Sequence, residues 1–248
     1  MIKGIPESRY EVDFMLKMLK VVLDLVFPCS CVNCGKWVRS ADYHICPGCR
    51  SDIRPAENSC AVCGGLLDSG NCTICRSRKV FVKGNIPVYE YDGSVKKLLH
   101  GLKFHSLRNA YMNFIPEMAR AAAGLPVKPD LITFVPMSRR KQAERGYNQS
   151  ALIARAIGRN LGIPYVRVLM ERSGYRSQRG LGRVDRYINV IDRYKACDII
   201  KFTGRTILLV DDVFTTGSTI NECSRQLLRC GASAVYSITV ARADPDKN

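Results

Sequence analysis

The alternation of apolar and polar residues predicts a parallel α/β domain in the second half of the chain. Apolar runs at 131–135 and 207–210 have the length and composition of strands buried on both faces, and 235–240 has the pattern of a third strand. Helical spacing of apolar residues predicts helices at about 150–161 and between Gly217 and Gly231. A strand, a loop, a helix and a further strand in this order are typical of a β-loop-α-β unit.

The N-terminal stretch is also apolar, but it has a different pattern. Residues 14–27 include Lys17, Lys20 and Asp24, which argue against a secretory signal or a membrane span. The apolar positions fit helical spacing, so we expect an amphipathic helix within an extension of residues 1–28. Because no secretory signal is visible, we expect a cytoplasmic protein.

The loop after 207–210 has the composition of an anion site. Asp211 and Asp212 are expected to end the strand, and the loop that follows offers hydroxyl donors from Thr215, Thr216, Ser218 and Thr219. Backbone N–H groups at a helix N-terminus lack helical partners, and the helix dipole favours negative charge there. Gly217 lets the backbone approach a phosphate closely. Two carboxylates beside a phosphate loop can hold sugar hydroxyls, so the segment predicts a site for a phosphate and a ribose.

Other interpretations of this loop fit the residues less well. It is not a Walker A motif, because no Gly-Lys-Ser/Thr ending is present. A plain helix cap in another α/β protein is an alternative, and receiver domains also carry an acidic pair at a strand end. The run of hydroxyl side chains around Gly217 favours the phosphate site over both.

The cysteines indicate a metal-binding module over residues 29–78. Eight of the twelve form four C-x-x-C pairs, namely Cys31/Cys34, Cys46/Cys49, Cys60/Cys63 and Cys72/Cys75. Two such turns complete a tetrahedral thiolate site, so four turns suit two structural zinc ions with no ligand position left for water. The spacing is compatible with two arrangements: neighbouring pairs that share each ion, or a cross-braced pairing. Cys29 and His44 lie outside the pattern and are expected to be bystanders.

The charge balance indicates an anionic partner. The chain has 38 Lys and Arg against 22 Asp and Glu, a net charge of +16, which suits nucleic acid or a polyphosphate ligand. Six arginines between residues 172 and 193 predict a basic loop. This loop is compatible with a lid over a charged ligand, a solvated surface loop or a nucleic-acid contact.

Several motifs together resemble a known family. The D-D-V-F-T-T-G-S-T segment at 211–219 resembles the 5-phosphoribosyl-1-pyrophosphate (PRPP) signature of type I phosphoribosyltransferases. The cysteine pairs, Y-D-G-x-V-K-K-L-L at 91–99, V-P-M-S-R-R at 135–140 and R-G-Y-N-Q at 145–149 precede it in an order similar to that of the ComF family of competence-associated bacterial proteins.

This resemblance implies a type I phosphoribosyltransferase-like parallel sheet flanked by helices over residues 79–248, preceded by a small zinc-ribbon module with four cysteines per zinc ion. It also implies PRPP with Mg²⁺ as ligand. Asp211 and Asp212 would hold the ribose, residues 215–219 the 5-phosphate, and Ser138, Arg139 and Arg140 the pyrophosphate. Arg139 and the two aspartates form the implied catalytic set.

Two functions remain open from the sequence. The first is an enzyme that transfers the ribosyl group of PRPP to an acceptor. The second is a PRPP-regulated or single-stranded-DNA-binding adapter without catalysis, and a degenerate domain without ligand is the third and weakest alternative. The resemblance also implies a role in DNA uptake or the use of external DNA, with a competence helicase and DNA-processing proteins as partners.

Overall fold

The computed structural model describes residues 18, 29–39, 43–104, 107–172 and 190–243. The expected helix in the extension 1–28, apart from Met18, and most of the arginine-rich loop lie outside the described residues. Among those that the structure describes, no helix combines the length and the apolar character needed to cross a lipid bilayer.

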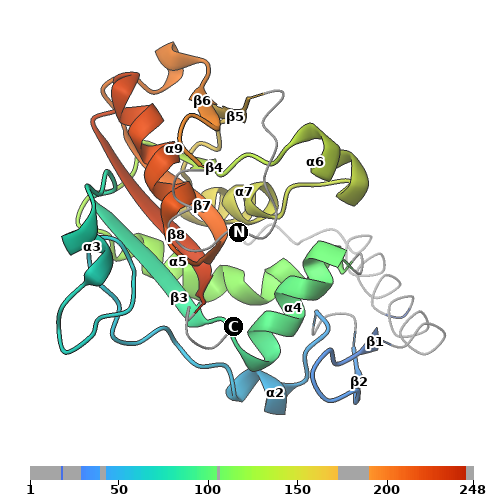
Figure 1. Ribbon diagram of the computed structural model, residues 1–248. Coiled ribbons are helices and arrows are strands. Elements are labelled where there is room, and N and C mark those ends of the chain that lie inside the picture. The colour runs from blue at the N-terminus through green and yellow to red at the C-terminus, as the bar shows by residue number, and fades with distance from the viewer. Residues whose placement is uncertain (1–17, 19–28, 40–42, 105–106, 173–189, 244–248) are drawn as a thin grey trace, which may run out of the picture.

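A four-stranded parallel sheet forms the centre of the molecule (Figure 1). Its strand order is β3-β8-β7-β4, and the strands span β3 Gly84–Glu90, β8 Ala234–Arg242, β7 Thr206–Phe214 and β4 Leu131–Phe134. Val210 in β7 lies opposite both Phe134 of β4 and Ile238 of β8. The predicted fold class is therefore confirmed, and β7 is an interior strand whose backbone is paired on both sides.

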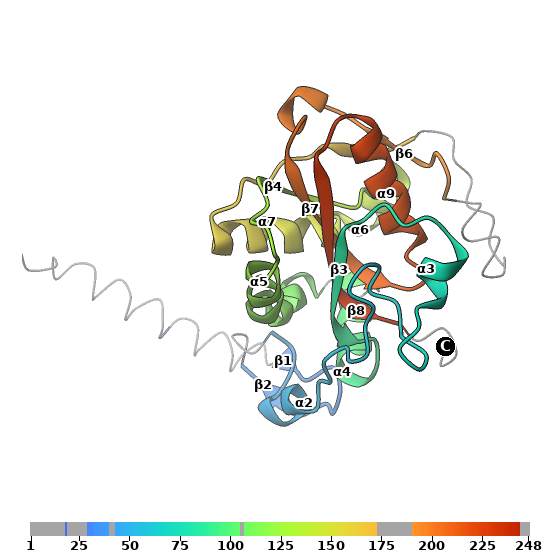
Figure 2. The same cartoon turned by 90° about the vertical axis from the view of Figure 1, so that its left-hand side faces the viewer.

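Helices cover both faces of the sheet (Figure 2). One face carries α4 Gly93–Phe104, η2 Arg108–Phe114, α5 Ile115–Ala123 and α7 Gln149–Leu161; the other carries α9 Ser218–Arg229 and the hairpin of β5 Leu169–Glu171 and β6 Tyr194–Ala196. Along β7, Leu208 and Val210 enter the first core, whereas Ile207 and Leu209 enter the second. This alternation directs successive side chains of β7 to opposite layers.

The connections that follow β4 and β7 pass over opposite faces of the sheet. After β4 the chain runs through α6 Arg139–Arg145 and α7, then returns beside the outer edge of β4, where Ile132 bonds Pro164 and Val166 through the backbone. After β7 it crosses the other face through α9 to reach β8. Loops that diverge in this way open a crevice at the carboxyl ends of the two strands, where open α/β sheets bind ligands.

The cysteine-rich segment packs directly against this domain. It contains β1 Cys29–Ser30, β2 Trp37–Val38, α2 Pro47–Ser51 and α3 Thr73–Ser77. Its first half shares the core of α4, because Val38, Ile45 and Cys49 join the cluster that includes Leu98. Its second half meets β3, where Asn85 Nδ2 donates to the carbonyl oxygen of Cys63 at 3.0 Å. The cysteine-rich segment is thus part of the packed body rather than a separate unit.

Two details differ from the sequence prediction. The expected strand at 207–210 continues to Phe214, so Asp211 and Asp212 lie inside β7 rather than at its end. The reason is that β8 continues to pair with β7 as far as Phe214 and Arg242. The short helix α6 was not predicted; Ser138 caps its start and Gly146, with a φ of 77°, ends it.

Candidate functional site

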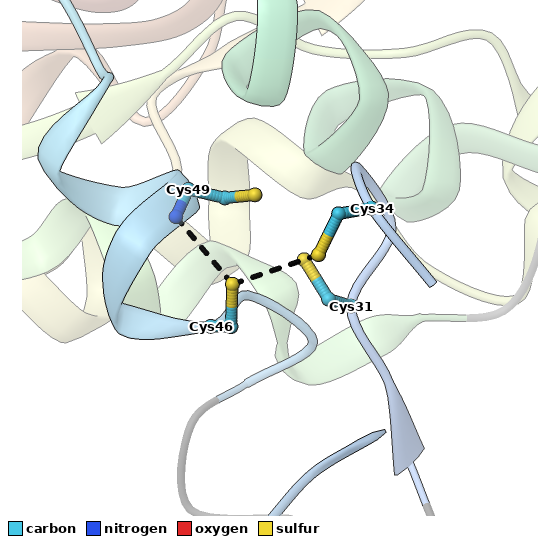
Figure 3. Close-up of side chains that lie close together, drawn as sticks. All are labelled: Cys31, Cys34, Cys46 and Cys49. Atoms are coloured by element: carbon cyan, nitrogen blue, oxygen red, sulfur yellow. Dashed lines mark hydrogen bonds between the residues drawn. The ribbon is translucent and has the colours of Figure 1, made fainter. Parts of the chain in front are cut away.

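The eight paired cysteines form two groups. Cys31, Cys34, Cys46 and Cys49 form one, Cys60, Cys63, Cys72 and Cys75 the other, and within each group the sulfur atoms all lie within 4.8 Å of one another. Figure 3 shows the first group, with thiols from a loop and from α2 turned toward one another. Neighbouring pairs therefore share each site, and the cross-braced arrangement is excluded.

The spacing of the sulfur atoms fits a tetrahedral zinc site. Zn–S bonds of about 2.3 Å place the sulfurs of a tetrahedron about 3.8 Å apart. The Cys34 and Cys46 sulfurs are 3.7 Å apart, and those of Cys60 and Cys75 are 3.8 Å apart. Four thiolates leave no position for water, so both groups suit structural zinc. Neither group includes Cys29 or His44.

Backbone amides also support thiolate ligands. Burial works against ionisation of Cys60, but hydrogen bonds from the backbone N–H groups of Cys63 and Val62 and from the Cys72 and Cys75 thiols together outweigh it and lower the pKa of Cys60 to about 7. Burial raises the pKa of Cys75 to about 11. Four neighbouring thiols therefore do not all ionise by themselves near neutral pH, and a divalent cation supplies the missing charge.

The acidic pair in β7 is buried and has different partners for each residue. Asp212 accepts hydrogen bonds from Lys103 Nζ at 2.6 Å and from Gln149 Nε2 at 2.9 Å. Asp211 accepts one from Ser150 Oγ at 3.0 Å and one from the backbone N–H of Asp212 at 2.9 Å. Helix α4 supplies the lysine and the start of α7 supplies the other two side chains, so residues far apart in sequence converge on this pair.

These partners separate the two pKa values. Burial and the neighbouring Asp212 carboxylate raise the pKa of Asp211 to about 7. Burial opposes the ionisation of Asp212 as well, but the Lys103 ammonium group and the Gln149 hydrogen bond outweigh it and lower the pKa of Asp212. The pair therefore favours a negative charge on Asp212, whereas Asp211 holds a proton up to a higher pH than an ordinary carboxyl group does.

The loop after β7 brings its hydroxyl groups to the start of α9. Gly217 has a φ of 71° and caps α9, and a side chain there would collide with the Phe214 ring, because its Cβ would lie 2.6 Å from Cε2. Thr216 Oγ1 and Ser218 Oγ are hydrogen-bonded at 2.8 Å, and Thr215 is exposed. The backbone at this position thus requires glycine, as expected for a loop that approaches a ligand closely.

A cavity of about 420 Å³ opens over the acidic pair at the carboxyl edge of the sheet. Of the predicted residues, its lining includes Asp211, Asp212, Thr219 and Ser138. Arg139 and Arg140 are exposed and do not line it, and Arg140 instead pairs with Glu144 at 2.9 Å. Other side chains supply the basic lining: Lys103, Lys141, Arg145 and Arg193.

Sequence reasoning did not assign a site role to Lys103, Gln149 or Ser150. Lys103 comes at the end of a helix 109 positions before Asp212, so no local pattern links the two. Gln149 and Ser150 open α7, where polar residues are ordinary near a helix start. Only the tertiary arrangement distinguishes these residues from surface residues.

Two family models and several known proteins are similar to the chain. A double zinc ribbon domain matches residues 22–79, and a phosphoribosyl transferase domain matches residues 148–248. Competence protein F of Haemophilus influenzae is 29% identical, with 88% of this chain and 98% of that protein covered. Over most of its length the chain is similar to competence proteins of the ComF type.

Further relatives are similar to the chain at comparable levels. DNA utilization protein YhgH of Salmonella typhi is 29% identical, covering 85% of this chain and 96% of the relative. Competence protein ComFC of Bacillus subtilis is 27% identical, covering 86% and 84%. The predicted resemblance to the ComF family and the predicted order of a zinc ribbon before a phosphoribosyltransferase-type domain are therefore confirmed.

The two cysteine groups predict a defined metal content. We expect the purified chain to carry two zinc ions, and Cys75→Ser to carry one, because three thiolates and a hydroxyl hold zinc poorly. Cys29→Ser should retain both, since Cys29 belongs to neither group. Elemental analysis of the proteins after gel filtration measures this. Full zinc retention in Cys75→Ser, or zinc loss in Cys29→Ser, would show that the assignment of ligands is wrong.

Asp211 predicts a pH dependence of stability. Its pKa rises from 3.8 to about 7 on folding, so between these values the unfolded chain loses a proton that the folded chain keeps. Stability therefore falls as pH rises through this window and is constant with respect to this group above it. Asparagine does not ionise, so Asp211→Asn avoids this loss of stability. The difference in unfolding temperature between Asp211→Asn and wild type should therefore shift in favour of the variant from about pH 5 to about pH 8.

The control for this measurement is Asp198→Asn, because Asp198 is exposed and pairs with Lys201 at the surface. Thermal unfolding at both pH values compares each variant with wild type, so that effects common to all three proteins cancel. A constant difference between Asp211→Asn and wild type across the window would contradict the prediction.

Proposed function

We propose that this chain binds PRPP together with Mg²⁺ at the carboxyl edge of β7. The observation that carries the proposal is the placement of two buried carboxylates in β7 directly before a glycine-containing hydroxyl loop at the start of α9. Carboxylates accept hydrogen bonds from ribose hydroxyls, and backbone N–H groups at a helix N-terminus bind phosphate. Neither part alone would select a phosphorylated ribose.

The remaining groups of the cavity suit the pyrophosphate. Ser138, Lys141 and Arg145 line it beside the acidic pair, and their donors and positive charges complement a polyanion. Bound Mg²⁺ would neutralise part of the pyrophosphate charge. We assign Lys103 the task of keeping Asp212 ionised, so that this carboxylate accepts hydrogen bonds from the ligand.

Transfer of the 5-phosphoribosyl group is the reaction that such a complex supports. The bond between C1 and the pyrophosphate oxygen would break, the electron pair leaving with pyrophosphate, while a nucleophile bonds to C1. Cationic side chains fixed around the leaving group stabilise the charge that develops there. The names of the relatives, competence and DNA utilization proteins, support a role for this chemistry in DNA uptake or the use of external DNA. As part of the proposal, the protein would act in the cytoplasm beside DNA-processing proteins.

A second function, binding of single-stranded DNA, is favoured by a separate observation. Phe104 is 61% exposed at the rim of the cavity, and the guanidinium of Arg145 lies over its ring at 5.1 Å. Exposed aromatic rings among cations are typical of surfaces on which bases stack. The net charge of +16 is consistent with a nucleic-acid partner.

PRPP titration tests the first proposal. Calorimetry with Mg²⁺ should show binding to wild type, and Asp212→Asn and Thr216→Ala should each weaken it by about tenfold or more, because each removes a group at the site. Asp198→Asn serves as the matched surface control. Circular dichroism before titration establishes that each variant is folded. If PRPP gives wild type neither a heat of binding nor thermal stabilisation, the proposal is refuted.

DNA binding has its own test. Fluorescence anisotropy with a labelled single strand should give an affinity that falls steeply with salt, and Phe104→Ala should weaken it by about tenfold through lost stacking. Ile200→Ala, which removes a side chain that is 95% exposed elsewhere, should bind like wild type. If the affinity changes neither with salt concentration nor in Phe104→Ala, this second function is excluded.

A further inference from the structure

An arginine from the second cysteine group reaches the phosphate loop. Arg78 directly follows α3, which carries Cys75, and its backbone N–H bonds the carbonyl of Ile74 at 3.2 Å. Its guanidinium donates through Nη2 to the carbonyl oxygen of Thr216 and through Nη1 to Ser218 Oγ at 3.2 Å. One side chain therefore joins the cysteine group to both sides of Gly217.

The bond to Thr216 fixes the direction of a neighbouring donor. A trans peptide holds its C=O and N–H groups antiparallel. When Arg78 holds the Thr216 carbonyl on one side of the loop, the N–H of Gly217 points to the other side. The Gly217 φ of 71° and the Phe214 ring, which occupies the space that a Cβ on Gly217 would need, leave this peptide little freedom to rotate. The contact thus orients one of the N–H groups on which anion binding at a helix start depends.

A second set of contacts fixes the chain beyond Arg78. Asn221, in the first turn of α9, accepts from the backbone N–H of Phe81 at 2.8 Å and donates to the carbonyl of Lys79 at 3.1 Å. Asn221 is only 5% exposed. Between these contacts, Ile74 and Phe214 line a void of only about 10 Å³, so the cysteine group and the start of α9 form one packed contact.

Cysteines form most of the buried interior of the segment that carries Arg78. Its buried apolar cluster consists of Cys60, Cys63 and Cys72, with Leu67, Ile74, Cys75 and Val80 packed around them. So small a core does not hold a fixed shape without a cross-link, and four thiols in tetrahedral spacing are suited to supply one through zinc. The position of Arg78 is therefore set by the second cysteine group.

We propose that Arg78 is a positioning residue through which the second cysteine group sets the conformation of the phosphate loop. The inference rests on the proposed PRPP site and deepens it, because it makes anion affinity depend on the metal-binding segment. It assigns the second group a task that the first does not share, since the first packs against α4.

Arg78→Ala tests the inference, because it leaves all eight cysteines in place. Hydrogen–deuterium exchange of residues 215–222 without ligand should accelerate by about tenfold or more, and PRPP should bind about tenfold more weakly. Arg78→Lys should restore part of both, since an ammonium group can donate to one partner but does not reproduce the guanidinium fork. Zinc content and unfolding temperature should stay near those of wild type.

The matched control is Arg76→Ala, because Arg76 is exposed on α3, two residues before Arg78. This change should leave hydrogen–deuterium exchange and PRPP affinity as in wild type. If Arg78→Ala exchanges and binds PRPP as wild type does, the inference is overturned, but the proposed PRPP site is not. Faster exchange with unchanged affinity would also overturn it. If wild type binds no PRPP, the proposed function fails, and exchange in Arg78→Ala alone decides whether Arg78 holds the loop.

Discussion

Two adjacent carboxylates are buried in β7, an interior strand of the sheet, and the surrounding groups offset the free-energy cost of burying their charge. A buried carboxylate is tolerated when it is paired or when it keeps its proton. Strand geometry sends Asp211 and Asp212 toward opposite layers, so a single cation cannot serve both equally. Asp212 receives Lys103 at 2.6 Å, whereas Asp211 has a hydroxyl and a backbone amide and a raised pKa.

The topology explains why these partners come from distant segments. Helix α4 lies on the same face as Val210 and delivers its last turn to Asp212, and the start of α7 follows the divergence of the chain after β4. The crevice between β4 and β7 is therefore lined by groups from different connections. A binding site of this kind combines a rigid strand with loops that can differ between relatives without altering the sheet.

Sequence reasoning predicted the features that local chemistry determines. The strand at 207–210, the loop at 215–219 and the eight paired cysteines are short-range patterns, and the structure has the strand, the loop before α9 and two groups of four cysteines. The sharing of each site by neighbouring pairs is decided by the tertiary structure, because the spacing allowed a cross-braced arrangement as well. The length of β7 was underestimated, because its extension to Phe214 depends on pairing with β8. Lys103 and Arg78 could not be recognised, since their roles arise from contacts across 109 and 138 positions.

The first cysteine group shares its apolar core with the domain that it precedes. Val38, Ile45 and Cys49 contribute to the same cluster as the buried face of α4. Any ion that binds only the folded chain raises the population of that chain by mass action. A cell with abundant zinc would therefore keep more of this protein folded, and a cell short of zinc would lose it to proteolysis. Metal supply would then regulate how much of the protein is present, independently of how well each molecule binds its ligand.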